Sequence, residues 1–318
     1  MASLSLHLKP VPPFRLDLTV WVLRRRPHNL MDRWDQGTYR RVLLVGETPM
    51  AVAVRQTAPP EAPELQVDVQ GAEPEFEAEA ETSEILAATL TWMLGLDIDL
   101  AEFHRFAAQQ PRLQPLVREF RGVKPPRFPS LFEALVNAIA CQQLSLTVGI
   151  HLLNRLTQAC GAPFPGAAGA AHAFPQPQDL AEVEPQALRD LGFSHNKART
   201  IIELSRNLVA GRAGLDHLDS LDDIEAIKTL SRLRGLGRWS AEYVLLRGLG
   251  RTHLFPGDDV GARRKLQEWL NLREPLDYQG VRRVLAGFHP FGGLIYFHFL
   301  LSHLAAAGHL ATGKAAPR

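Results

Sequence analysis

Cysteine is almost absent from this chain, and the little that occurs forms no recognisable site. Only Cys141 and Cys160 are present among 318 residues, and neither belongs to a CxxC pair or a Cys/His run. The sequence therefore supports neither a disulfide framework nor a zinc or iron–sulfur site. Two isolated thiols suit a reducing compartment, so we expect a cytoplasmic protein.

Long apolar runs and a targeting segment are also missing. The N-terminus has no basic segment followed by an apolar stretch and a small-residue cleavage site, and the longest apolar run, near residues 86–96, is interrupted and too short to span a bilayer. The twelve histidines are dispersed without an HExxH pattern. We therefore expect no membrane role, no catalytic metal and no redox cofactor.

The net charge is close to zero, but the charges are unevenly distributed. The formal value of +1 excludes a polybasic protein. Residues 61–84 hold nine acidic side chains and no basic one, whereas residues 228–283 hold twelve basic and six acidic side chains. Such a basic surplus suits a polyanionic partner, and arginines scattered over solvated helix faces are the alternative explanation.

The first part of the chain is strand-like. Apolar and polar residues alternate in FRLDLTVWVL, RRVLLVGE, PMAVAVRQ and ELQVDVQ between residues 14 and 69, with glycine or proline between the segments. This pattern predicts a small antiparallel sheet. The acidic, proline-containing stretch 71–82 is typical of a linker, after which Thr82 or Ser83 can cap a helix that begins at Glu84.

Beyond residue 84 the pattern is almost entirely helical. Apolar residues recur at three- and four-residue spacing in 131–142 and 146–158, and Ser145 is the expected N-cap of the second of these helices. Glycine and proline recur throughout 161–178, which predicts a loop. Two more helices are expected over 196–211 and from Asp222 to Arg232, where the acidic pair 222–223 suits the positive helix end.

These patterns predict an α+β fold in three parts. The parts are a small antiparallel β/α domain with its acidic linker over 1–83, a two-lobed helical domain over 84–310, and a frayed tail over 311–318.

A helix, a tight turn and a second helix are expected around LRGLGRWSAEYVLL, residues 233–246. Gly235 and Gly237 accept positive φ without a Cβ penalty and let another backbone approach closely. The free N–H groups of the turn and of the helix that starts near Arg238 then suit a phosphate. A lone GxG between helices is weak evidence by itself, because glycine commonly ends helices.

Three motifs together resemble a known family. GLGRWSAEY, PGDD and AIACQQLS are similar to the hairpin, the Pro/Gly–Asp turn and a helix junction of the helix-hairpin-helix, Gly/Pro-rich, Asp superfamily of DNA glycosylases. Within it they resemble the bacterial 3-methyladenine DNA glycosylase II type. The domain order, a small sheet domain before a helical pair, is similar too. The resemblance is strong after residue 130 and weak before residue 84.

The resemblance implies that Asp259 is the catalytic carboxylate and that its neighbour Asp258 is structural. A fixed carboxylate shielded from bulk water can stabilise an oxocarbenium-like sugar and orient a water. Adjacent side chains at a helix start diverge by about 100°, so the two cannot serve equally. The alternative is a plain Asp–Asp N-cap before the helix that begins at Val260.

Trp239 bears on the type of reaction. Strand-nicking members of the superfamily carry a lysine at this position, two residues after the second hairpin glycine, and an indole cannot form a Schiff base. Lys228 and Lys265 lie off the motif. The resemblance therefore implies a monofunctional enzyme that leaves an abasic site in an intact strand.

The resemblance also implies residues that handle a flipped base. Gln142 and Gln143 occupy the family's gap-probing positions, with Leu144 as the alternative wedge, because relatives carry an apolar residue where Gln143 stands. A polar junction between two helices is the structural alternative. Aromatic rings attract cationic alkylated purines. The expected pocket residues Trp239, Tyr243 and Phe291 could equally be core residues.

Phosphate contacts and one ion complete the implied site. The expected phosphate-binding residues are Gly235, Gly237, Arg238, Ser240, Arg263, Arg264 and Lys265, and for the basic ones an ordinary solvated face is the alternative. The family often binds Na⁺ or K⁺ through hairpin carbonyls, which map to Ser231, Leu233 and Leu236. The family's four-cysteine iron–sulfur loop is absent.

The function that follows is a monomeric, monofunctional bacterial DNA glycosylase, cytoplasmic and nucleoid-associated when bound. It would flip and excise alkylated purines of the 3-methyladenine type from double-stranded DNA in base excision repair. One rival is oxidised-guanine or hypoxanthine specificity on the same scaffold. The other is a non-catalytic helix-hairpin-helix DNA-binding protein.

Overall fold

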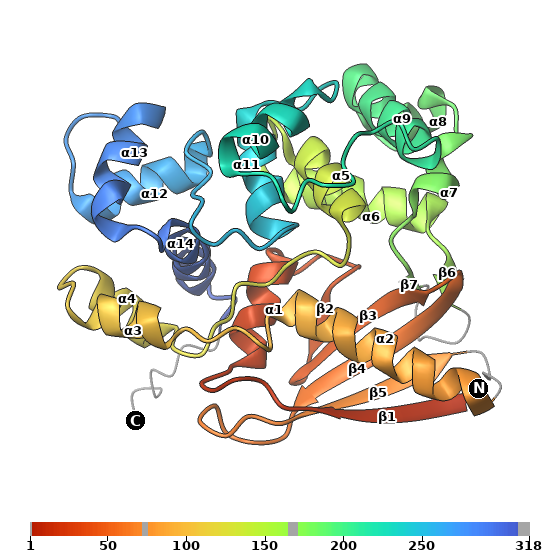
Figure 1. The fold of residues 1–318 in the computed structure, drawn as a ribbon, viewed down its shortest axis with the longest axis horizontal. Coiled ribbons are helices and arrows are strands. Elements are labelled where there is room, and N and C mark those ends of the chain that lie inside the picture. The colour runs from red at the N-terminus through yellow and green to blue at the C-terminus, as the bar shows by residue number, and fades with distance from the viewer. Residues whose placement is uncertain (1, 72–75, 165–170, 311–318) are drawn as a thin grey trace.

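The computed structural model describes residues 2–71, 76–164 and 171–310. A five-stranded sheet forms one side of the molecule and most of the helices lie on the other, as Figure 1 shows. The α+β class predicted from the sequence is confirmed. The tail expected over 311–318 lies outside the described residues.

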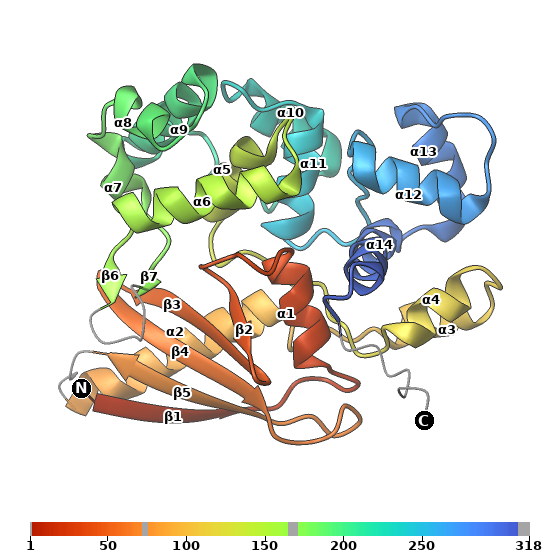
Figure 2. The same ribbon diagram turned by 180° about the vertical axis from the view of Figure 1, so that it is seen from behind.

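The sheet is antiparallel and has the strand order β1-β5-β4-β3-β2. Buried apolar residues alternate with more exposed ones along β4 and β5. The buried residues belong to a core that also includes Leu86 and Leu90 of helix α2. Helix α2 lies along one face of the sheet (Figures 1 and 2). The elements are β1 (Ala2–Leu8), β2 (Arg33–Asp35), β3 (Thr38–Val45), β4 (Thr48–Gln56), β5 (Leu65–Gly71) and α2 (Phe76–Leu94).

The first strand predicted for this domain was wrong. The segment FRLDLTVWVL, expected as a strand, forms helix α1 (Leu16–Arg24), and the unpredicted β1 takes its place at the sheet edge. Every residue of α1 except Asp17 is buried. A short segment that is buried all round carries no period that separates strand from helix. Its contacts with α2, α14 (Gly292–Ala306) and β2 decide its structure.

The predicted linker and the helix start at Glu84 were also wrong. Helix α2 begins at Phe76, so the expected domain boundary at residue 84 falls inside a helix that contacts β1 and β3. Alanine and glutamate are strong helix formers, and the prediction gave too much weight to the negative charge of the glutamates. The expected linker residues 72–75 lie outside the described residues.

The remaining helices form two groups (Figure 1). The helices predicted from residues 131, 146, 196 and 222 are confirmed to within two residues at each end, and Ser145 caps its helix by accepting from Val148 N. One group holds α5 (Leu131–Cys141), α6 (Leu146–Cys160), α7 (Pro177–Ala181), α8 (Pro185–Asp190), α9 (His195–Val209), α10 (Asp223–Arg232) and α11 (Arg238–Arg247). The other holds α3 (Ala101–Ala108), α4 (Leu113–Glu119), α12 (Val260–Leu270), α13 (Tyr278–Leu285), η1 (Ala286–Phe288) and α14.

The predicted loop 161–178 holds a little regular structure. Strands β6 (Pro163–Phe164) and β7 (Ala171–His172) pair in it and contact β4 and β3, and helix α7 begins at its end. Within the described ranges no single helix is long and apolar enough to cross a membrane. The segments Tyr278–Phe288 and Gly292–Ala306 meet that test only as a pair bent by 104°.

A buried charge network joins the sheet to helix α5. Arg41 of β3 donates to Asp32 at 2.7 Å and to Glu133 of α5 at 2.5 Å, and all three side chains are almost fully buried. Burial raises the pKa of Glu133, although Arg41 opposes the shift. Together with one apolar core that runs from the sheet to α11, this network fixes the sheet domain against the helices.

Candidate active site

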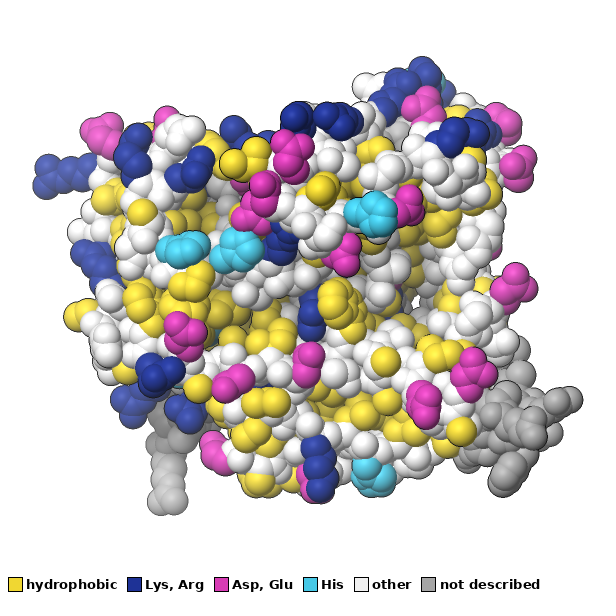
Figure 3. All heavy atoms as spheres, in the orientation of Figure 1, with side chains coloured by type: hydrophobic (Ala, Val, Ile, Leu, Met, Phe, Trp, Pro, Cys, Tyr) yellow, Lys and Arg dark blue, Asp and Glu magenta, His cyan; other side chains and the backbone are white. Residues whose placement is uncertain are grey.

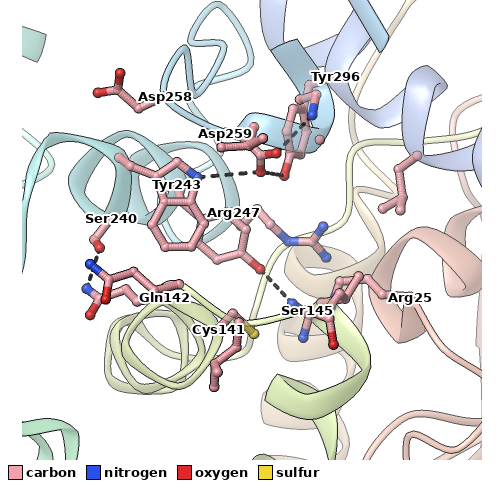
Figure 4. A pocket seen from close by; sticks show the side chains of 18 of the residues that line it. Arg25, Cys141, Gln142, Ser145, Ser240, Tyr243, Arg247, Asp258, Asp259 and Tyr296 are labelled. Carbon is pink, nitrogen blue, oxygen red and sulfur yellow. Dashed lines mark hydrogen bonds between the residues drawn. The ribbon is translucent and has the colours of Figure 1, made fainter. Parts of the chain in front are cut away.

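Five segments that lie far apart in the sequence surround one cavity of about 880 Å³. They are the end of α1, the α5–α6 junction, the α10–α11 hairpin, the start of α12 and one face of α14. Figure 4 shows this cavity with Asp259 and Tyr296 on one side and Arg25 on another. Among the residues predicted for the site, most line this cavity.

The hairpin has the predicted bounds, because α10 ends at Arg232 and α11 begins at Arg238. Gly235 has a φ of +73°, and a Cβ there would lie 2.6 Å from Thr200 Oγ1 of α9. Gly237 has a φ of −110°, so the positive φ expected for both glycines is wrong for Gly237. A Cβ added at Gly237 would have no described atom within 4 Å apart from those of its chain neighbours. Gly235 is therefore required by the fold, whereas Gly237 keeps the surface before α11 open.

Asp259 has two separate contacts, one for each carboxylate oxygen. Its Oδ1 accepts from Ala262 N at 2.9 Å and caps helix α12. Its Oδ2 accepts from the Tyr296 hydroxyl at 3.1 Å and from Trp239 Nε1 at 3.4 Å (Figure 4). The structural and the catalytic interpretation of Asp259 are therefore compatible, because the cap fixes the carboxylate while Oδ2 stays at the cavity.

Asp258 diverges from Asp259, as the helix-start geometry predicts (Figure 4). It forms an ion pair with Arg238 at 2.7 Å, and the Arg238 guanidinium lies 3.5 Å from the centre of the Tyr278 ring. Arg238 is therefore already paired in the free protein. A phosphate contact by Arg238 stays a prediction, and it would have to compete with this carboxylate.

Glu242 supports the turn that carries both aspartates, a role that no sequence motif indicated. Its carboxylate accepts from Gly257 N at 3.1 Å and from the Tyr278 hydroxyl at 2.6 Å. Burial raises the pKa of Glu242, and these two hydrogen bonds oppose the shift. The contacts hold the turn before α12 against α11.

The predicted aromatic residues separate into two locations. Trp239 and Tyr243 line the cavity and their rings stack at 5.5 Å with an interplanar angle of 27°. Phe291 does not line it and instead packs against Phe103 and Phe106 at 5.3 and 5.0 Å. The expectation for Phe291 was therefore wrong, because its ring is enclosed by helix α3.

The α5–α6 junction also separates into two parts. The Gln142 side chain donates to Gly235 O at 2.8 Å and to Ser240 Oγ at 2.7 Å, so it joins the junction to the hairpin. Gln143 has a φ of +54° and is exposed, and the neighbouring Leu144 is 43% exposed. The side chains free to enter a gap are therefore those of Gln143 and Leu144. Ser240 is 2% exposed, which does not favour a phosphate contact by its hydroxyl.

Basic side chains border the cavity. Arg264 and Lys265 line it and pair with Glu268 at 3.6 and 3.0 Å, whereas Arg263 lies outside it. In Figure 3, Lys and Arg gather along the upper edge, over helices α9, α10 and α13. Helices α10 and α13 carry part of the basic surplus that the sequence shows in residues 228–283.

Two buried arginines at the cavity were missed by the sequence analysis. Arg25 follows α1 and is 3% exposed, and its guanidinium donates to the Tyr243 hydroxyl at 2.8 Å and to Asn137 Oδ1 at 2.6 Å. Arg247 of α11 is 1% exposed and donates to Val22 O at 2.9 Å. The run Arg24–Arg26 is visible in the sequence, but its contact with residues more than a hundred positions away is not.

Among the described residues no group of three or more His, Cys, Asp or Glu side chains could hold a metal. Leu233 O in the hairpin accepts from Leu236 N at 3.1 Å. A Na⁺ or K⁺ ion on the carbonyls of Ser231, Leu233 and Leu236 stays a prediction.

Comparison with known proteins gives a consistent result. Residues 136–289 match the model of the HhH-GPD superfamily base excision DNA repair protein. A DNA-3-methyladenine glycosylase of Bacillus subtilis is 32% identical over 57% of this chain and 60% of its own length. The DNA-3-methyladenine glycosylase 2 of Escherichia coli is 33% identical over 45% of this chain and 50% of its own length. The alignments thus span about half to three fifths of these relatives.

Solved structures extend the likeness to the sheet domain. The 3-methyladenine DNA-glycosylase from Archaeoglobus fulgidus matches with a TM-score of 0.79 and 24% identity, over 96% of this chain and 100% of that one. An 8-oxoguanine glycosylase/lyase of Clostridium acetobutylicum in complex with double-stranded DNA matches with a TM-score of 0.72 and 16% identity, over 96% and 98%. At these identities the likeness establishes the fold.

Proposed function

We propose, from the membership of residues 136–289 in the HhH-GPD superfamily of base excision DNA repair proteins, that this chain is a monofunctional DNA glycosylase. Its substrates would be alkylated purines of the 3-methyladenine type in double-stranded DNA. The observation that carries the proposal is the Asp259 carboxylate, held at the cavity by Trp239 and Tyr296 beside a phosphate-binding type of hairpin.

The proposed reaction is hydrolysis of the N-glycosidic bond. The target base leaves the stack and enters the cavity, at a cost of about a few kcal/mol that damage reduces. As the bond breaks, positive charge develops on the sugar, and Asp259 Oδ2 stabilises it and orients the attacking water. The N-cap contact with Ala262 N holds the carboxylate in place, so little reorganisation is needed.

The absence of strand cleavage rests on Trp239. In the proposed mode of binding, this indole occupies the place of a lysine nucleophile and instead donates to Asp259. An indole nitrogen cannot attack the sugar to form an imine. The product is then an abasic site in an intact strand.

The preference for alkylated purines is supported by two observations. The stacked rings of Trp239 and Tyr243 offer flat aromatic surface to a purine. The relatives in Bacillus subtilis and Escherichia coli carry the name DNA-3-methyladenine glycosylase.

Gln143 and Leu144 would fill the gap that the flipped base leaves, and the hairpin amides, Arg264 and Lys265 would hold phosphates. We also propose that the chain acts as a monomer in the bacterial cytoplasm.

Base release and strand trapping test this proposal in one experiment. Methylated DNA and duplexes with a single 7-methylguanine, hypoxanthine or 8-oxoguanine are incubated with the wild type, Asp259→Asn and, as the matched control, Asp258→Asn. We expect the wild type to release alkylated purines. Asp259→Asn should lose about 10³-fold or more of the rate while duplex binding persists. Asp258→Asn should lose no more than about tenfold.

The possible results separate the proposal from its rivals. Release of oxidised guanine or hypoxanthine without any alkylated purine would establish the other specificity. Duplex binding without release of any base would identify a non-catalytic DNA-binding protein. An unchanged rate in Asp259→Asn would place the chemistry at another residue, and a covalent adduct after borohydride treatment would overturn the monofunctional assignment.

A further inference from the structure

Two buried cations at the cavity take no part in the chemistry proposed above. Arg25 and Arg247 both line the cavity and are at most 3% exposed. The Nε of each has no hydrogen-bond partner among the described residues. Burying a charge is costly unless it is paired, and within the described ranges the two guanidinium groups donate only to neutral acceptors, namely the Tyr243 hydroxyl, Asn137 Oδ1 and Val22 O. Buried charged groups at a cleft are candidates for a role in the site.

The backbone of Arg25 is also unusual. It is the C-cap of α1 and has a φ of +63°, a left-handed conformation that favours glycine and disfavours arginine. Unfavourable backbone conformations of this kind gather at functional sites. Helix α1 belongs to the sheet domain, so that domain delivers Arg25 into a cavity formed mainly by the helical one (Figure 4).

Arg25 orients the hydroxyl of Tyr243. The guanidinium donates to the hydroxyl oxygen at 2.8 Å, and Figure 4 shows this hydroxyl pointing toward Arg25, away from Ser240 and Gln142. Burial raises the pKa of Tyr243, and Arg25 and Arg247 oppose the shift. The hydroxyl therefore keeps its proton at neutral pH. Because its oxygen already accepts from Arg25, that proton is available to an acceptor in the cavity.

The charges around the cavity are predominantly positive. Five basic side chains and two carboxylates line the cavity; Asp258 is already paired with Arg238, and Arg264 and Lys265 also pair with Glu268 outside it. The basic lining side chains are Arg25, Arg26, Arg247, Arg264 and Lys265. Arg26, Arg264 and Lys265 are partly or fully exposed, where they can meet phosphates. The two buried guanidinium groups lie with Tyr243, where a flipped base would enter.

The charge of the departing base decides whether the buried guanidinium groups and the Tyr243 hydroxyl speed or slow its release. When the C1′–N bond breaks, its electron pair goes to the base. A cationic N-methylpurine then leaves neutral, whereas a neutral base leaves with a negative charge. Donors and cations placed where negative charge develops accelerate bond cleavage, and the same cations oppose binding of a cationic base.

We propose that Arg25 is a positioning residue that aims the Tyr243 hydroxyl at the departing base and thereby lets the site release neutral damaged bases in addition to cationic ones. With a neutral lesion, water adds to C1′ and the proton that the water loses neutralises the departed base anion; with a cationic lesion, the base leaves neutral and that proton goes to solvent. The inference rests on the proposed glycosylase function and adds the charge class of the base. It also gives the sheet domain a role in the chemistry.

The test compares one neutral and one cationic lesion in the same duplex sequence. Single-turnover release of hypoxanthine and of 7-methylguanine is measured for the wild type, Arg25→Gln and Tyr243→Phe. We expect both variants to lose at least about tenfold on hypoxanthine and less than about threefold on 7-methylguanine. The double variant should lose no more than either single variant, because the two residues act on one donor. Arg25→Lys should recover part of the hypoxanthine rate.

Arg24→Gln is the matched control, because Arg24 ends the same helix but does not line the cavity. It should leave the ratio of the two rates unchanged, even if it lowers both. If Arg25→Gln does not fold, Tyr243→Phe removes a single oxygen and decides the question.

An equal loss on both lesions, or no loss on hypoxanthine, would show that Arg25 and Tyr243 are structural and would overturn the inference. A wild type that releases 7-methylguanine but never hypoxanthine would overturn it too, while leaving the proposed function intact. A wild type that releases neither base from any duplex would overturn the proposed function itself, and the inference with it.

Discussion

At the scale of single residues, the site depends on how one carboxylate is held. Asp259 could be a helix cap or a catalytic group from its position in the sequence, and the structure gives each oxygen its own partners. The cap restrains the side chain, and Tyr296 and Trp239 restrain the oxygen that stays at the cavity. A group fixed in this way needs little reorganisation during the reaction.

Tyr296→Phe tests this arrangement. Burial raises the pKa of Tyr296 well above its usual value, with the Asp259 charge adding to the shift, so the hydroxyl stays protonated and donates to Oδ2. Without that donor, Asp259 gains rotational freedom at the cavity. We expect the single-turnover rate of base release to fall about tenfold with little change in duplex affinity.

Tyr39→Phe is the control for Tyr296→Phe, because it removes a hydroxyl bound to Asp32 in the sheet domain, outside the cavity. It should lower stability but leave the rate of base release close to that of the wild type. A Tyr296→Phe enzyme as fast as the wild type would mean that the N-cap alone positions Asp259.

At the scale of elements, the hairpin combines two glycines with different roles. Gly235 needs its positive φ and its closeness to Thr200, whereas Gly237 has an ordinary backbone and open space beside it. The hairpin bounds could be predicted from the sequence, because helix caps and glycines act locally. It could not separate the glycines, because the neighbour of Gly235 comes from α9.

Replacing each glycine by alanine distinguishes an effect on stability from an effect on duplex binding. Gly235→Ala should lower the free energy of unfolding by about 2 kcal/mol, because it places a Cβ at positive φ and 2.6 Å from Thr200 Oγ1. Gly237→Ala should change it by less than about 1 kcal/mol. Its Cβ nevertheless occupies the surface where a DNA backbone would approach, so it should weaken duplex binding several-fold. Urea unfolding and duplex titration measure the two effects. Wild-type affinity in Gly237→Ala would exclude close approach of DNA at this turn.

Helices α1 and α2 show where element prediction failed. The amphipathic helices α9 and α10 have one apolar face each, and the bounds expected from their end residues lie within two residues of the observed ones. Helix α1 is buried on nearly every side, and α2 begins in a sequence with strong acidic bias. Periodicity is informative only where one side of an element faces water.

At the scale of the whole molecule, the distribution of charge over the surface matters more than the net charge. The chain is nearly neutral, yet basic side chains border the cavity and gather over α9, α10 and α13 (Figure 3). Such segregation lets a nearly neutral protein bind a polyanion. Binding that uses these side chains must weaken as salt rises, because bound counterions are released from DNA.

The salt dependence of duplex binding measures how many basic side chains contact phosphates. With about four phosphate contacts, a plot of log affinity against log salt should have a slope of about −3 to −4. Arg264→Ala should make the slope less steep by about one unit. Arg55→Ala, which removes a sheet residue paired with Asp68, should leave it unchanged. Equal slopes for the wild type and Arg264→Ala would remove Arg264 from the interface.

The sequence by itself determined the α+β class, the bounds of the hairpin and the Asp258–Asp259 pair at a helix start. These features depend on neighbours within a few positions, and local conformational rules suffice for them. Only the tertiary structure decided which aromatic residues line the cavity, that Asp258 pairs with Arg238 while Asp259 Oδ2 meets Tyr296, and that Arg25 of the sheet domain contacts the Tyr243 hydroxyl. Those outcomes depend on contacts between residues up to 218 positions apart, which no local pattern records.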